Sequence, residues 1–159
     1  MQRVYLETSV ISYLASRPSR DLIVAAHQRI SLDWWERRRH DYDLFLSELV
    51  LREAGAGDPE AAKRRLLLVS GIGIVAVTGE VAFLARRFLG PGLIPRQAVD
   101  DAVHVAIATV HGMDFLLTWN CRHIANAAIT RDLRSVAADH GFDLPAICTP
   151  EELLGESYV

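Results

Sequence analysis

Acidic and amide side chains stand beside three apolar segments of this chain. They are Glu7 after residues 4–6, Asp100 and Asp101 before residues 102–110, and Asn120 shortly after residues 115–117. In an open α/β sheet the buried strands end at a crevice where ligands bind, so polar groups at strand ends face that crevice. Carboxylates that converge there repel one another, and a bound divalent cation offsets the repulsion. The pattern therefore favours an α/β fold with an acidic crevice.

The length and composition favour one compact domain over residues 1–159. Half of the residues are hydrophobic, which is enough for a sizeable core. A chain of 159 residues is short for two domains. The net charge of -3 argues against a protein that holds nucleic acid by bulk positive charge. A local basic patch or a bridging metal would still allow RNA to bind.

The cysteines and the N-terminal segment predict a cytoplasmic location. Cys121 and Cys148 have neither a CxxC spacing nor a zinc-like pairing with histidines, so we expect reduced, buried thiols. The first residues lead straight into a strand without a signal-peptide pattern, and no apolar run approaches the ~18–20 residues of a membrane span. Free thiols are typical of a reducing cytoplasm.

Apolar runs that alternate with helical patterns predict the order of the elements. We expect strands at residues 4–6, 41–45, 71–77, 115–118 and 144–148. We expect helices at residues 10–15, 22–39, 48–57, 59–69, 81–89, 96–111, 123–140 and from 150 onward, with N-caps at Thr8 and Ser9, Asp21, Ser47, Asp58, Thr78 and Thr149. This alternation predicts a three-layer α/β/α fold around a parallel sheet of four to five strands.

Four polar residues occupy corresponding places on separate elements. Glu7 ends the first strand, Glu53 lies on the helix after the second, Asp101 lies in the first turns of the longest apolar helix, and Asn120 follows the fourth strand. In a parallel sheet, strand ends and the starts of the following helices share one edge, so these side chains can meet. Each acid alone is more often a solvated or capping residue, and only their joint placement favours a site.

At these positions the sequence resembles the PIN-domain nucleases, and among them the VapC-type toxins of bacterial toxin–antitoxin pairs. YLETSVISYL resembles their opening strand and first acid, and SELVLRE their serine followed six residues later by a glutamate. DDAVHVAIATVHGMDFLLTWN resembles their acid at the start of an alanine-rich helix and the strand that ends in Thr-x-Asn. AICTPEELL resembles their last strand and helix start, so the resemblance covers nearly the whole chain.

The resemblance implies a Mg²⁺- or Mn²⁺-dependent endoribonuclease that hydrolyses RNA phosphodiester bonds. It assigns metal binding and catalysis to Glu7, Glu53, Asp101 and Asn120. It also implies a PIN-like fold, a homodimer, and an antitoxin protein that blocks the acidic pocket.

Hydroxyl groups beside the predicted metal ligands are suited to hold the carboxylates in place. Thr8, Ser9 and Thr118 can each donate a hydrogen bond to a carboxylate oxygen, which is how neighbouring groups orient metal ligands. Asp100 is a further supporting candidate, although on a helix it points about 100° away from Asp101.

The chain departs from the family pattern at two of the four ligand positions. Glu7 stands where the family usually has Asp, so its side chain is one methylene longer. Asn120 offers only a neutral carbonyl oxygen. These departures predict weaker metal affinity and a preference for Mn²⁺ over Mg²⁺, because Mn²⁺ binds more tightly and accepts mixed oxygen and nitrogen ligands.

Several other residues are weaker candidates. His104 lies three residues after Asp101 on the same helical side, where a histidine is more often a core-edge residue than a site residue. For RNA contact the candidates are Arg122, His123, Arg37 and Arg38, against ordinary capping or dipole-complementing roles. Trp34 and Trp35 are adjacent on a helix and cannot both face one core, so we expect one to be partly exposed at a partner interface.

Two other functions are compatible with the pattern. The departures at Glu7 and Asn120 could have produced a catalytically weakened PIN-like module that binds RNA or protein. A phosphoryl-accepting receiver-like domain would need a lysine at a late strand end, and Lys63, the only lysine, precedes a helical segment instead.

Overall fold

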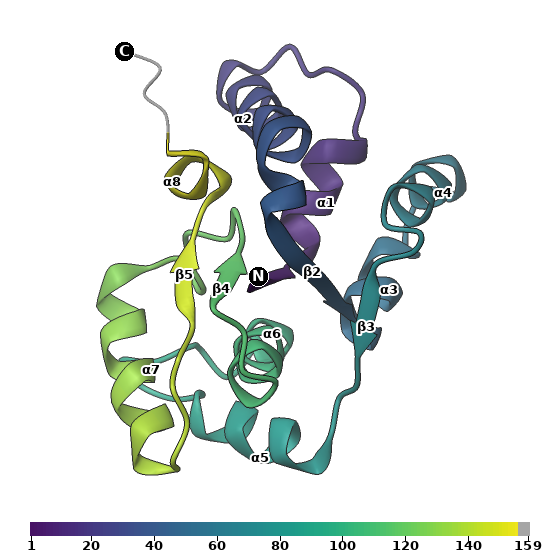
Figure 1. Cartoon of the computed structure of the whole chain (residues 1–159). Helices are drawn as coiled ribbons and strands as arrows, with labels where there is room; N and C mark the ends of the chain where they lie inside the picture. The colour runs from purple at the N-terminus through teal and green to yellow at the C-terminus, as the bar shows by residue number, and fades with distance from the viewer. Residues whose placement is uncertain (156–159) are drawn as a thin grey trace.

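The computed structural model describes residues 1–155 and contains a five-stranded parallel sheet of order β3-β2-β1-β4-β5. The strands are β1 Gln2–Leu6, β2 Tyr42–Ser47, β3 Gly73–Val75, β4 Phe115–Leu117 and β5 Ala146–Cys148. Helices α1, α2, α4 and α8 lie on one face of the sheet, and α5, α6 and α7 lie on the other (Figure 1). The predicted α/β/α fold with a parallel sheet is confirmed.

Most of the helices begin where the sequence supplies a cap, and α6, which follows Ala98, has no side-chain cap. The helices are α1 Thr8–Ala15, α2 Leu22–Arg38, α3 Glu48–Ala54, α4 Pro59–Leu68, α5 Gly79–Arg87, α6 Val99–Val110, α7 Ala127–Asp139 and α8 Pro150–Leu154, with a short 3₁₀ helix η1 at Arg39–Asp41. Five predicted N-caps accept a hydrogen bond from a backbone N–H of the first turn: Asp21, Ser47, Asp58, Thr78 and Thr149. The prediction that Thr8 and Ser9 cap the first helix is wrong, because α1 begins at Thr8 and its N-cap is Glu7, which accepts the N–H of Ser9.

Two helices begin later than the sequence pattern predicts. Helix α6, expected from residue 96, begins at Val99; for the other the reason lies beside the site. The helix expected from residue 123 begins at Ala127, capped by Asn126. Residues 121–125 instead form a tight turn, in which the N–H groups of Ile124 and Ala125 both donate to the carbonyl oxygen of Asn120. This turn folds the chain back over Asn120 and holds it just beyond β4.

The central strands are buried and set the register of the polar residues that follow them. Val4, Tyr5 and Leu6 of β1 are fully buried, and Leu6 pairs with Leu117 of β4. The N–H of Glu7 then donates to the carbonyl oxygen of Leu117. The ends of β1 and β4 therefore lie side by side, and the residues after each strand emerge together at the carboxyl edge of the sheet.

The expectation that one of the two adjacent tryptophans is partly exposed is wrong. Trp34 is 0% exposed and Trp35 is 8% exposed. Trp34 stacks on Tyr42, and the guanidinium group of Arg39 lies 4.5 Å from the ring centre of Trp35. Helix α2 packs against α1 and α8 as well as lying over the sheet, so both side chains are covered. The tryptophans therefore give no support to a partner interface.

The cysteine expectation holds for one residue and fails for the other. Cys148 is buried in β5, and burial together with the charge of Glu152 raises the pKa of its thiol to about 12. Cys121 is exposed, because the turn at residues 121–125 lies on the surface.

Two further features bear on the function classes considered above. Lys63 is exposed in the middle of α4 and lies at no strand end, which removes the basis for the receiver-like alternative.

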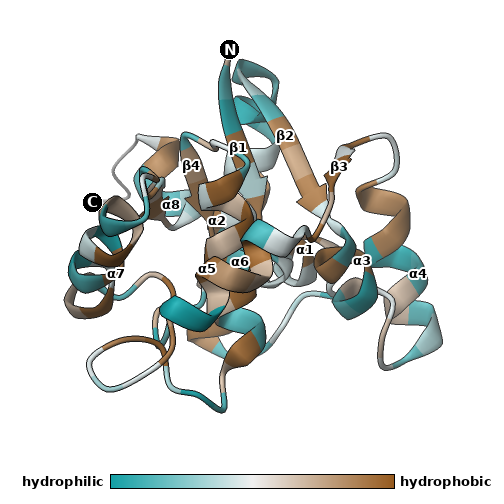
Figure 2. Cartoon of the chain, turned by 90° about the horizontal axis from the view of Figure 1, so that it is seen from below, coloured by the Kyte–Doolittle hydropathy of each residue, from teal (hydrophilic) through white to brown (hydrophobic). Residues whose placement is uncertain are grey.

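Within residues 1–155, none of the helices combines the length and hydrophobicity that crossing a bilayer requires. Apolar residues are concentrated in the strands and in α6, whereas α5 and α7 also carry hydrophilic residues (Figure 2).

The sheet centre should dominate the stability of this fold. Leu116 is fully buried in β4 between Tyr5 and Ile147. We expect Leu116→Ala to lower the free energy of unfolding by about 2–5 kcal/mol, through lost burial and a residual cavity. Leu67→Ala, at a side chain that is 66% exposed, should change it by less than about 0.5 kcal/mol. Urea denaturation measures both, and similar losses in the two variants would contradict the observed core.

Candidate active site

Glu7 lies at the junction of β1 and α1. It leaves the strand with an extended backbone and is the N-cap of α1, where its side chain accepts the N–H of Ser9 at 3.1 Å. The residue is only 6% exposed. A carboxylate at a helix N-terminus is stabilised by the helix dipole and by the free N–H groups of the first turn. The local sequence thus explains how an acid can be buried at this point.

Two hydroxyl groups fix the carboxylate of Glu7. Ser9 Oγ and Thr118 Oγ1 each donate to Glu7 Oε1 at 2.5 Å. The same hydroxyl oxygens accept backbone N–H groups of the segment after β4, from Trp119 at 2.8 Å and from Asn120 at 2.9 Å respectively. The carboxylate therefore connects the start of α1 to residues 118–120.

Glu53 reaches the same edge from the last turn of α3. Its Oε1 accepts hydrogen bonds from Thr8 Oγ1 at 2.7 Å and pairs with His104 Nε2 at 2.5 Å. Partial burial opposes ionisation of Glu53, but the His104 and Thr8 contacts, with the charge of Arg52, outweigh it and lower the pKa of the carboxyl group. The carboxyl group of Glu53 therefore loses its proton more readily than a free glutamate does.

His104 is the buried member of this group, at 1% exposure on the inner face of α6. Its Nδ1 forms a hydrogen bond of 2.7 Å with the hydroxyl of Tyr5, which in turn lies 2.8 Å from Ser47 Oγ. Burial raises the pKa of Tyr5 well above its usual range, and the charges of Glu7 and Glu53 add to this rise. Tyr5 therefore stays a neutral hydroxyl.

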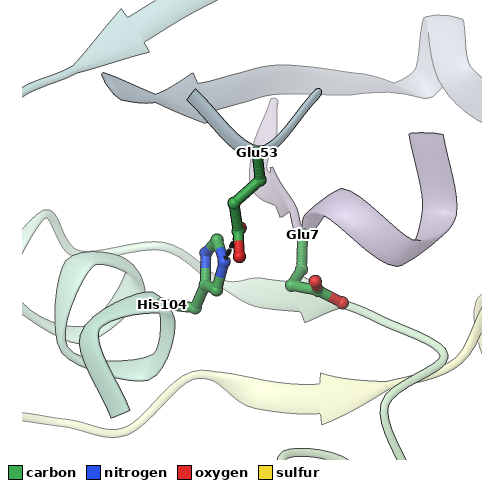
Figure 3. A group of neighbouring side chains, drawn as sticks. All are labelled: Glu7, Glu53 and His104. Carbon is green, nitrogen blue, oxygen red and sulfur yellow. Dashed lines mark hydrogen bonds and ion pairs between the residues drawn. The ribbon is translucent and has the colours of Figure 1, made fainter. Parts of the chain in front are cut away.

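Three of these side chains form a set suited to a metal. Ligand atoms of Glu7, Glu53 and His104 all lie within 4.8 Å of one another, and Figure 3 shows Glu53 and His104 in contact with Glu7 beside them. Two carboxylate oxygens and one imidazole nitrogen are ligands that Mn²⁺ and other first-row divalent cations accept. The donor set thus fits a divalent cation at the carboxyl edge of the sheet.

The other two predicted ligands, Asp101 and Asn120, belong to a neighbouring group. Asp101 Oδ2 lies 2.9 Å from His123 Nδ1, and Asn120 Oδ1 accepts the N–H of His123 at 3.0 Å. His123 therefore connects the start of α6 to the turn after β4. Among the described residues, the close three-residue group contains Glu7 and Glu53 but not Asp101.

The remaining candidates lie at different places. Asp100 forms an exposed ion pair of 3.5 Å with Arg52. Arg38 contacts Asp41 and the carbonyl oxygen of Leu154. Arg37 and Arg38 end α2, which leads through η1 into the start of β2, so they lie toward the opposite edge of the sheet from Glu7. Arg122 is exposed in the turn that follows Asn120.

Similarity to solved structures lies at the level of fold. No family model matches the sequence, and no curated protein sequence matches it significantly. A chain of VapBC2 from Rickettsia felis, in a complex with a DNA fragment from its promoter, superposes with a TM-score of 0.59 at 13% identity, over 93% of this chain and 98% of that one. VapC20 of Mycobacterium tuberculosis, described as a sarcin–ricin loop cleaving toxin, superposes with a TM-score of 0.57 at 17% identity, over 75% of this chain and 91% of that one. The chain has the VapC fold.

Within this VapC fold, sequence reasoning missed Tyr5, gave Ser47 no role beyond that of a motif serine and helix cap, and undervalued His104. Tyr5 looked like an apolar strand residue and Ser47 like a helix cap, yet together they hold His104. The one available signal for Tyr5 was a hydroxyl in the middle of a fully buried strand, which requires a hydrogen-bond partner. For His104, the signal was its helical spacing from Asp101.

Thr118 should be the hydroxyl on which the Glu7 arrangement depends most. We expect Thr118→Val to lower the free energy of unfolding by about 1–3 kcal/mol, because a buried carboxylate and the N–H of Asn120 both lose a partner. Thr109→Val is the matched control, since that buried hydroxyl donates only to the helical carbonyl of Val105 and its loss should cost little. Equal stability of the two variants in urea would show that Glu7 does not need the Thr118 bond.

Proposed function

We propose that this chain is a metal-dependent endoribonuclease, built as a single PIN-like domain over residues 1–159 and acting in the cytoplasm as the toxin of a toxin–antitoxin module. The observation that carries the proposal is the convergence of Glu7, Glu53 and His104 at the carboxyl edge of a VapC fold. A buried acidic edge of this kind is where α/β sheets bind ligands. The free thiols of both cysteines agree with the location.

The choice of RNA as substrate and of an antitoxin as partner rests on the proteins that share the fold. VapC20 is described as cleaving the sarcin–ricin loop, an RNA, and VapBC2 as a complex on promoter DNA. By analogy we propose an RNA phosphodiester as substrate, a small antitoxin that covers the acidic edge, and a homodimer. Within this scheme Arg122 and His123, in the turn beside Asn120, are the basic residues placed to meet an RNA phosphate.

The chemistry we propose divides the polar residues into two tasks. Glu7 and Glu53 would hold a Mg²⁺ or Mn²⁺ ion, and Asp101 and Asn120 would contribute directly or through its water shell. Such an ion, when bound, makes a water molecule more acidic and offsets charge on the phosphate. Thr8, Ser9 and Thr118 keep the carboxylates oriented. His123 contacts one carboxylate oxygen of Asp101 and so limits how the Asp101 side chain can turn.

A weakened binding module is the competing function. It would keep the fold and the acidic edge but lose turnover through the longer Glu7 side chain and the neutral Asn120. Metal binding with no RNA cleavage would favour it.

Asp101 is the residue whose removal separates catalysis from folding. We expect Asp101→Asn to reduce cleavage by more than about 100-fold, the scale on which loss of a catalytic group acts. Its melting temperature should stay similar or rise, because the amide oxygen can still accept from His123 and one negative charge is removed.

Cleavage should be measured on a sarcin–ricin loop hairpin and on total RNA, with Mn²⁺ or Mg²⁺ present and after removal with EDTA. Asp132→Asn, an exposed acid of α7, is the matched control and should keep full activity. Cleavage that survives EDTA, or that is unchanged in Asp101→Asn, would contradict the proposed function.

A further inference from the structure

We propose that His104 is itself a metal ligand, through Nε2, and that the buried hydroxyls of Tyr5 and Ser47 position it by setting which ring nitrogen carries the proton. This inference rests on the proposed metal-dependent function and extends it, because it adds a nitrogen donor to a site predicted to contain only oxygen donors.

The geometry directs one nitrogen of His104 at the carboxylates. Nε2 faces Glu53 and lies within the 4.8 Å group that includes Glu7, whereas Nδ1 is on the far side of the ring against Tyr5. The imidazole is almost fully buried, so it cannot swing out into solvent. Nε2 therefore already faces the two carboxylates with which it would share a cation.

The partners of Nδ1 allow either tautomer of a neutral ring. In one arrangement that these contacts allow, Ser47 Oγ–H donates to Tyr5, Tyr5 O–H donates to Nδ1, and Nε2–H donates to Glu53. In the other, which holding a cation through Nε2 would require, Nδ1–H would donate to Tyr5 and Tyr5 O–H would donate to Ser47 Oγ, which already accepts the N–H of Val50. A hydroxyl can both donate and accept, so Tyr5 serves either arrangement, and Ser47 Oγ–H gives up Tyr5 as its acceptor in the second.

The proton count is the same in both states. One proton leaves Nε2 for solvent, one arrives at Nδ1 from solvent, and the two hydroxyls rotate while keeping their own hydrogens. The lone pair of Nε2 would then be available to bind a cation. Glu53 would lose the N–H donor on Nε2 and would contact the cation instead. A hydrogen bond from the second ring nitrogen is the usual device that orients a metal-bound histidine. A phenylalanine at position 5 could supply neither direction of this bond.

A nitrogen ligand also accounts for the metal preference predicted from the sequence. Mg²⁺ strongly favours oxygen ligands, whereas Mn²⁺ and the later first-row cations accept imidazole. The preference for Mn²⁺ over Mg²⁺ should therefore depend on His104 as well as on Glu7 and Asn120.

Pulsed EPR of the Mn²⁺-loaded protein tests ligation directly, because a coordinated imidazole gives a nitrogen hyperfine coupling whether or not RNA is cleaved. We expect this coupling in the wild type and in His123→Gln, and its loss in His104→Gln. Thermal melting checks that both variants are folded. Coupling that persists in His104→Gln, or that is lost in His123→Gln instead, would overturn the assignment.

The positioning role of Tyr5 has its own test. We expect Tyr5→Phe to weaken Mn²⁺ binding by about 10- to 100-fold, as loss of a partner of a metal-bound histidine does. Tyr42→Phe is the matched control, because it removes a hydroxyl at the start of β2, at the opposite edge of the sheet. Equal Mn²⁺ affinity in the two variants would overturn the positioning role.

The outcomes keep the two proposals apart. Saturable Mn²⁺ binding without nitrogen coupling in the wild type overturns the role of His104 and leaves a metal-dependent nuclease with oxygen ligands. No Mn²⁺ binding in the wild type overturns the metal-dependent function and the ligand assignment together.

Discussion

The buried carboxylate of Glu7 is the interaction on which the rest of the site depends. It caps α1 through Ser9, accepts the hydroxyl of Thr118, and so holds the start of α1 against the segment that follows β4. A buried carboxylate is costly unless hydrogen-bonded, and these contacts supply its partners. They also fix residues 118–120, and through Asn120 the turn that carries His123. One acid thereby sets the geometry of both polar groups at this edge.

Local signals in the sequence located the elements and most of the polar residues. Ser47 and Asp58 stand directly before helical patterns, and Glu7 stands directly after an apolar strand pattern. Short-range patterns were therefore sufficient to place these three residues at the ends of their elements. The contact between Glu53 and His104 depends instead on how α3 and α6 approach each other across β1, which no short-range pattern encodes. Trp34 and Trp35 show the same limit, since helix geometry predicted that one of them is exposed, whereas the packing of α2 against α1, α8 and the sheet covers both.

The four residues assigned by family resemblance do not form one symmetrical set of ligands. Glu7 and Glu53 gather around His104, whereas Asp101 and Asn120 both contact His123. Each pair is thus accompanied by one histidine, His104 on α6 for the first and His123 in the turn after β4 for the second. In the proposed function Glu7 and Glu53 would hold the cation, and Asp101 and Asn120 would reach it directly or through its water shell.

Cation binding at the carboxyl edge is the central claim, and isothermal titration calorimetry of Mn²⁺ and Mg²⁺ tests it most directly. The wild type should bind Mn²⁺ saturably and more tightly than Mg²⁺, and Glu53→Gln should lose that binding. Glu48→Gln, an exposed acid in the first turn of the same helix, should retain it. The account would be contradicted if the wild type binds neither cation at millimolar concentration, or if Glu53→Gln binds Mn²⁺ as tightly as the wild type.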